Sequence, residues 1–168
     1  MALSLRHSFP TDPQTYWTKI FFDEEYNRRL FVDTLGFRLY EVLEQREEAD
    51  GTRVRKVRVR PASDPPAAVK KVMGEAPTSV EEGRWDPKTM RYTFHVTPGT
   101  LPDKIKITGE TRTEKTGEKS MDRIVTATPS VSIFGIGGIL ESFIERTMRD
   151  SYERGAEFTK RFIAEKGL

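Results

Sequence analysis

The chain has 168 residues, a formal net charge of +2 and no cysteine. This length fits one domain over residues 1–168, and the lack of cysteine excludes disulfide scaffolds and thiolate metal sites. Basic and acidic residues are mixed along the chain, whereas nucleic-acid-binding proteins concentrate Lys and Arg on one surface, so we predict no nucleic-acid partner.

The sequence also indicates where the protein works. No apolar stretch approaches the roughly 20 residues that span a bilayer, and no signal peptide is recognisable, so we expect a cytoplasmic protein. His7 and His95 lie far apart without metal-ligand spacing, so we expect neither a metal nor another cofactor. The sequence carries no signal of an oligomeric state.

The N-terminal part predicts one strand followed by two short helices. Residues 3–9 alternate apolar and polar side chains, which is typical of a strand. Asp12 before Pro13 indicates a helix N-cap with proline at the first helical position. Asp23 and the acids after it indicate the start of a second helix, which Gly36 ends. Both helices are rich in aromatic residues, so we expect them to cover one end of a sheet.

Six consecutive antiparallel strands are predicted next. Residues 37–45 and 53–61 flank a hairpin signal at 49–51, and further strands are expected over 80–85, 90–96, 104–112 and 119–132. The segment 61–76 contains several prolines and a short amphipathic turn at 67–74. A lid over the end of the sheet and a plain connector both remain open for this segment.

Residues 134–168 predict a glycine turn followed by one long amphipathic helix, with apolar residues at three- and four-residue steps. The glycines match no phosphate-binding motif, and we interpret them as permitting a sharp reversal of the chain. The apolar helix face needs a partner surface, which a strongly curled six-strand meander offers. A curved sheet around one helix does not close its core everywhere, so we expect a cavity between them.

This order of elements resembles the helix-grip fold of the START/Bet v 1-like (SRPBCC) superfamily over essentially the whole chain. Three stretches are similar to an uncharacterised bacterial lipid-binding-like group: Asp12-Pro13 with Tyr16-Trp17, residues 65–74, and residues 137–141. The resemblance implies an α+β fold in which a curved antiparallel seven-stranded sheet surrounds a long C-terminal helix, with two short helices after the first strand. It also implies an internal cavity for a hydrophobic small molecule, either a lipid or a polyketide-like compound.

We predict that the ligand-binding residues face this cavity from the sheet and from the first half of the long helix. Phe158 and Phe162, in the second half, are expected to pack more closely. The predicted ligand-binding residues are Phe37, Leu39, Glu41, Tyr92, Phe94, Ile105, Ile107, Leu140, Phe143, Ile144, Thr147 and Met148.

Two other functions stay open at this point. A polyketide cyclase or dehydratase would need an acid or base inside the cavity, and the candidates are His95, Glu41, Asp122 and Tyr92. His95 shares its strand face with polar residues, which favours a position in solvent, and we assign no catalytic residue. A protein-interaction module of the chaperone-cofactor type would instead have a filled interior and an exposed apolar patch.

A local basic run occupies the third predicted strand: Arg53, Arg55, Lys56, Arg58 and Arg60. A solvated strand face is the favoured interpretation. The alternative is contact with an anionic partner or headgroup, which would allow a transient contact with a membrane surface.

Overall fold

The computed structural model describes residues 2–62, 64–75 and 77–168. Within these residues, a seven-stranded antiparallel sheet has the order β1-β7-β6-β5-β4-β3-β2. The strands are β1 (Leu3–Phe9), β2 (Leu39–Glu47), β3 (Arg53–Arg60), β4 (Ser79–Asp86), β5 (Arg91–Pro98), β6 (Ile105–Gly117) and β7 (Ser120–Val131). The strands from β2 to β7 pair in sequence order, and β1 pairs with β7, which confirms the predicted meander.

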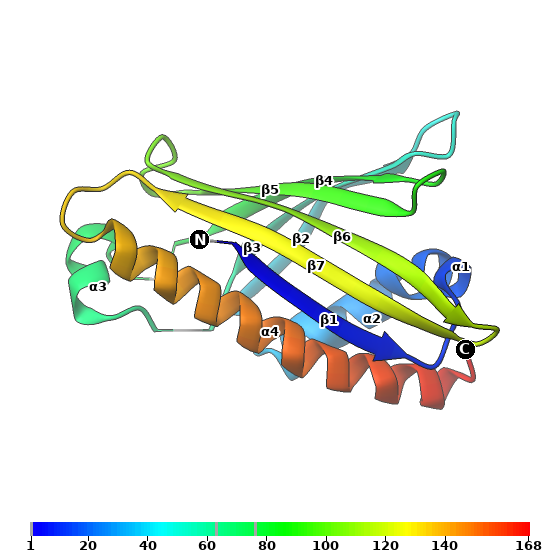
Figure 1. Cartoon of the computed structure of the whole chain (residues 1–168). Coiled ribbons are helices and arrows are strands. Elements are labelled where there is room, and N and C mark those ends of the chain that lie inside the picture. The colour runs from blue at the N-terminus through cyan, green and yellow to red at the C-terminus, as the bar shows by residue number, and fades with distance from the viewer. Residues whose placement is uncertain (1, 63, 76) are drawn as a thin grey trace.

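The long C-terminal helix is α4 (Gly137–Lys166), which ends at Gly167 with a left-handed φ of 66°. It runs along the concave side of the curved sheet, below β1 and β7 (Figure 1). The predicted α+β helix-grip fold is therefore confirmed.

The two short N-terminal helices begin where the capping residues predict. The Asp12 carboxylate accepts the Thr15 N–H at 2.9 Å, and the Asp23 carboxylate accepts the Tyr26 N–H at 2.8 Å. Each helix then widens: α1 (Pro13–Thr15) continues into the π-helical segment η1 (Tyr16–Phe21), and α2 (Glu24–Arg28) into η2 (Arg29–Thr34). The sequence predicted these helices but not their π-helical turns.

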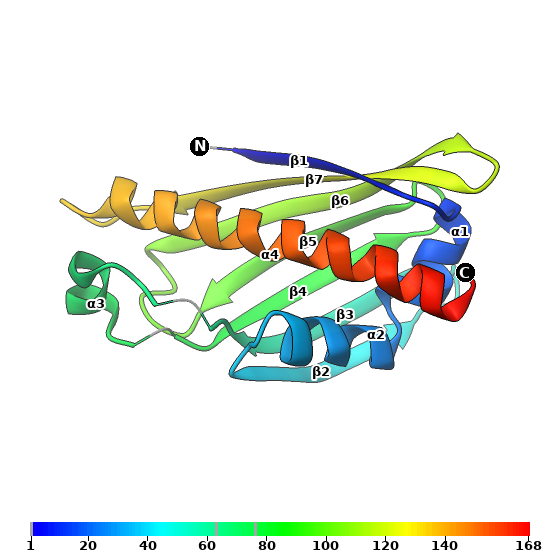
Figure 2. The ribbon, with the colours of Figure 1, turned by 90° about the horizontal axis from the view of Figure 1, so that it is seen from below.

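The main core fills the end of the sheet that the N-terminal helices cover. Trp17 is fully buried, its ring lies 5.7 Å from the ring of Trp85, and its indole N–H donates to Thr113 Oγ1 at 2.9 Å. A smaller core at the opposite end joins Val69 and Met73 of α3 (Ala67–Met73) to residues of β6 and α4. Figure 2 shows these two groups of helices at opposite ends of α4.

Most contacts between α4 and the described strands lie along one side of the sheet. The helix packs on β1 and β7 and, across from them, on η2. Gly155 permits the close approach to η2, because a Cβ there would lie 3.3 Å from Leu30 Cδ1. The concave face of β3 to β6 is thus left opposite a gap that side chains must fill or leave open.

Candidate ligand-binding cavity

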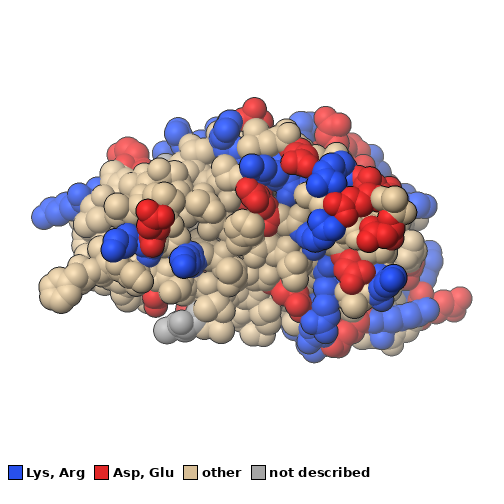
Figure 3. All heavy atoms as spheres, turned by 90° about the horizontal axis from the view of Figure 1, so that it is seen from above, with Lys and Arg blue, Asp and Glu red and all other residues tan. Residues whose placement is uncertain are grey.

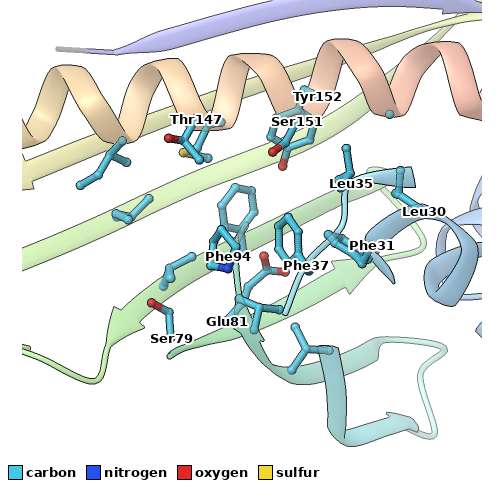
Figure 4. Close-up of a pocket in the computed structure, with 18 of the residues that line it drawn as sticks. Leu30, Phe31, Leu35, Phe37, Ser79, Glu81, Phe94, Thr147, Ser151 and Tyr152 are labelled. Carbon is cyan, nitrogen blue, oxygen red and sulfur yellow. The ribbon is translucent and has the colours of Figure 1, made fainter. Parts of the chain in front are cut away.

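A cavity of about 280 Å³ lies between the concave face of the sheet and α4. Its walls are mainly apolar, and its size is near the lower limit of small-molecule sites, which span about 300–1,000 Å³. Figure 4 shows side chains from β4, β5, η2 and α4 converging on it. The wall residues include Val57, Val59, Ser79, Glu81, Tyr92, Phe94, Val96, Ile105, Ile107, Thr111, Phe143, Ile144, Thr147, Met148, Ser151 and Tyr152.

A more open hollow of about 560 Å³ adjoins this cavity and forms its mouth. The rim carries both charges, with Arg146, Asp150 and Arg154 on α4 and Asp64 before α3. The residues that border both spaces are Leu35, Phe37, Pro61, Phe143, Thr147 and Ser151. The cavity therefore opens between the middle of α4 and the proline-containing segment that precedes α3.

The structure brings most of the predicted site residues together at the cavity wall: Phe37, Tyr92, Phe94, Ile105, Ile107, Phe143, Ile144, Thr147 and Met148. Leu140 is buried beside the cavity, in the cluster with Val69, Met73 and Ile105, and does not line it. Whether the wall residues bind a ligand stays a prediction.

The predicted inward orientation of Leu39 and Glu41 is wrong. Phe37 does line the cavity, but β2 begins only at Leu39, so the period-two alternation does not extend back to Phe37. Within β2 the inward residue is Tyr40, whose ring stacks on Phe31 at 4.6 Å. Glu41 points to solvent instead and forms an ion pair with Arg58 at 3.1 Å.

The other candidate acids and bases divide between the two faces of the sheet. His95 is on the outer face, with 54% of its side chain exposed and Nε2 3.5 Å from Glu82. Asp122 accepts hydrogen bonds from Arg6 and Ser8 on β1, again away from the cavity. Of these four candidates, only Tyr92 borders the cavity. Glu41, His95 and Asp122 therefore cannot serve as the acid or base of a cyclase reaction inside it.

The sequence analysis did not predict the charged residues that face the cavity. Arg55 of β3 is only 5% exposed, and Glu81 of the neighbouring β4 lies 3.7 Å from it. Tyr92 donates its hydroxyl proton to the same Glu81 oxygen at 3.0 Å. Burial and the adjacent carboxylate raise the pKa of Tyr92 well above its ordinary value, so the phenol stays a neutral donor.

The basic residues of β3 therefore point alternately to the two faces of the sheet. Lys56 and Arg58 face outward and pair with Glu82 and Glu41, which confirms a solvated face for them. The same interpretation is wrong for Arg55, because Arg55, Val57 and Val59 alternate along the cavity wall. That alternation was the signal in the sequence. Figure 3 shows Lys and Arg interspersed with Asp and Glu on one part of an outer face, whose remainder is mostly uncharged.

The segment around α3 closes the far end of the cavity. Val69 and Met73 line the cavity and are buried against Ile105 and Leu140, so α3 packs on the rim of the sheet. Positions 63 and 76 of the segment 61–76 lie outside the described residues. A lid movement of this segment stays a prediction.

Gly83 sets the position of Tyr92. A Cβ at Gly83 would come within 1.9 Å of the Tyr92 hydroxyl oxygen, so the ring occupies the space of the missing side chain. We expect Gly83→Ala to displace Tyr92 from Glu81 and to lower the free energy of unfolding by about 1–3 kcal/mol. Urea unfolding measures this loss. Gly138→Ala is the control, since a Cβ there meets nothing within 4 Å, and equal stability of the two variants would contradict the prediction.

The sheet and the long C-terminal helix together form a helix-grip fold, which is also the fold of a START superfamily structure. The chain belongs to the family described as "Protein of unknown function (DUF2505)", whose model matches residues 4–163. A comparison with curated protein sequences finds no match.

Solved structures with this fold match the chain over nearly its whole length. TTHA0849 from Thermus thermophilus has a TM-score of 0.68 and 16% identity, with 100% of both chains covered. The Zhui aromatase/cyclase from Streptomyces sp. R1128 has a TM-score of 0.64 and 16% identity, over 100% of this chain and 99% of that chain. A START superfamily protein from Mycobacterium smegmatis has a TM-score of 0.60 and 11% identity, covering 98% and 97%. At such identities the likeness shows the fold alone.

Residues 2–62, 64–75 and 77–168 contain no group of three or more His, Asp or Glu side chains placed to hold a metal ion. Over the same residues, none of the helices has the length and hydropathy that crossing a bilayer requires.

Proposed function

We propose that this protein binds a hydrophobic small molecule, a lipid or a polyketide-like compound, between the sheet and the first half of α4. The observation that carries the proposal is the mainly apolar cavity with a mouth beside Phe37 and Thr147. Burial of apolar ligand surface there would supply about 25 cal/mol per Å². Thr147 and Ser151 add hydroxyl groups to the helix wall, and a few polar groups of this kind orient a ligand.

A cyclase-like reaction is the second candidate, and Glu81 with Tyr92 is the observation that favours it. Both side chains border the cavity, and one structural neighbour is named as an aromatase/cyclase. Glu81, however, already accepts from Tyr92 and lies beside Arg55, which supports binding over proton transfer. The interaction-module alternative predicted a filled interior, and the cavity is contrary to that prediction. The cytoplasmic location and a transient membrane contact stay predictions.

The binding proposal can be tested with a neutral fluorescent probe, N-phenyl-1-naphthylamine. We expect the wild-type protein to enhance its fluorescence with saturation at one site. Ile144→Trp should remove most of this binding, because Ile144 lines the cavity and a larger side chain would fill it. Ile139→Trp is the matched control on the same helix, since Ile139 is 46% exposed and does not line the cavity.

Absence of saturable binding by the wild-type protein would refute the proposal, as would equal binding by the two tryptophan variants. Thermal unfolding with and without the probe gives a second measurement, because a ligand that binds only the native state raises the melting temperature. Native mass spectrometry of protein purified from its own host would then identify the natural ligand.

A further inference from the structure

One end of the cavity wall carries more buried positive than negative charge. Arg55 on β3 and Arg123 on β7 both line the cavity, and they are 5% and 4% exposed. Arginine is rarely this deeply buried unless a carboxylate or another anion accompanies it. The question is therefore whether each of the two guanidinium groups has a negatively charged partner nearby.

Arg55 has a counter-ion. Its Nη2 lies 3.7 Å from Glu81 Oε1, and its Nη1 donates to the Phe21 carbonyl oxygen at 3.2 Å. The guanidinium also lies over the Phe21 ring, 4.6 Å from the centroid. Burial lowers the pKa of Arg55, but Tyr92 and Glu81 outweigh burial, so the pKa lies above its ordinary value.

Arg123 has no such partner. No carboxylate in the described part of the chain lies within ion-pair distance of it. Its Nη2 lies 3.2 Å from His7 Nδ1 and 3.3 Å from the Tyr152 carbonyl oxygen, and the rings of Phe9 and Tyr152 flank it. Burial, together with Arg123 itself, lowers the pKa of His7, so the imidazole is uncharged at neutral pH.

Two of the nearby phenols, those of Tyr26 and Tyr152, do not supply the missing negative charge. Burial raises the pKa of Tyr26 and of Tyr152 well above the ordinary value, so both stay neutral at physiological pH. Both residues line the cavity with Arg123. Counting Arg55 and Arg123 against Glu81, this end of the wall keeps one positive charge in excess.

Hydrogen-bond donors are also left over at this end. The Nε atoms of Arg55 and Arg123 are buried and have no hydrogen-bond partner among the residues that the structure describes. Buried donors without partners are rare in native proteins and mark sites where a further group completes the network. An anion beside Arg123 inside the cavity would accept a hydrogen bond from its unpartnered donor and balance the excess charge.

We propose that the ligand carries one carboxylate, which pairs with Arg123 while its apolar body lies along the first half of α4. This inference rests on the proposed function and specifies its ligand class as an apolar carboxylic acid. A single carboxylate matches the excess charge of one, and its two oxygens match the fork of donors on a guanidinium. The apolar body would contact Phe143, Ile144 and Met148.

The test compares decanoate with decan-1-ol, which share a chain and differ in the charged group. Binding is measured by isothermal titration calorimetry at low salt and at pH 8, where the carboxylate is ionised. We expect the wild-type protein to bind decanoate about 10- to 100-fold more tightly, the range for hydrogen bonds to a charged group. Arg123→Met should weaken decanoate binding by a similar factor and leave decan-1-ol within about twofold.

Arg91→Met is the control, because Arg91 is 49% exposed on β5 and pairs with Glu110, away from the cavity. It should keep the preference for decanoate. If the wild type binds both compounds equally, or if Arg123→Met weakens both equally, the carboxylate inference is wrong and the proposed function stands. If the wild type binds neither, both proposals fail. The wild-type comparison decides the matter even if Arg123→Met does not fold.

Discussion

Phe158→Ala and Phe162→Ala should each lower the free energy of unfolding by about 3–5 kcal/mol, the usual cost for a phenylalanine in a close-packed core. The two side chains are 4% and 2% exposed, and their rings lie 5.6 Å and 5.2 Å from the ring of Tyr26. The surroundings should fill only part of the space that each substitution leaves, because α4 packs against both η2 and β1.

Phe143→Ala, on the same helix, should cost clearly less. Phe143 is half-buried and borders both the cavity and its mouth, so it has fewer contacts to lose. The substitution should also enlarge the cavity and shift ligand preference toward bulkier molecules. Urea unfolding of the three alanine variants provides the comparison. Equal losses at Phe143 and Phe158 would mean that α4 packs uniformly, and the cavity would lose its significance for binding.

Arg55→Met and Arg123→Met should affect stability in different ways, although both remove a buried arginine from the same cavity. Arg55→Met leaves Glu81 without its cation, and breaking a buried ion pair costs about 3–5 kcal/mol. Because the Glu81 side chain is 23% exposed, water compensates in part and we expect about 3 kcal/mol.

Arg123→Met leaves no carboxylate behind, so without ligand we expect a stability within about 1 kcal/mol of wild type, or above it. Its loss also removes the excess charge from an apolar environment. Chemical denaturation of the ligand-free variants measures both effects. Adding Glu81→Gln to Arg55→Met should restore part of the loss. Losses of equal size at Arg55 and Arg123 would contradict the distinction between a paired and an unpaired guanidinium.

Arg123 is expected to add nothing to the stability of the ligand-free protein, and one of its donors has no acceptor among the described residues. A ligand could supply that acceptor. Proteins often keep such residues at binding sites at some cost in stability. The stability of Arg123→Met without ligand and its affinity for decanoate are therefore two independent measurements on the same side chain.

Local patterns in the sequence determined the element order and much of the cavity wall. Capping residues such as Asp12 and Asp23 mark helix starts, because short-range hydrogen bonds fix them. Period-two alternation placed Tyr92 and Phe94 on the inner face, because successive side chains of a strand must point to opposite sides. The same rule, applied to Arg55, would have placed this arginine inside the fold.

Tertiary structure decided which inward positions border open space. Leu140 and Ile144 lie one helical turn apart. Of the two, only Ile144 lines the cavity, because Val69 and Met73 of α3 pack around Leu140. Glu41 faces outward because β2 begins after Phe37 and takes its register from β3. The unpaired state of Arg123 likewise depends on β7, β1 and α4 meeting with no carboxylate among the described side chains close enough to pair. Such contacts join residues as far apart in the chain as His7 and Arg123, and no local pattern encodes them.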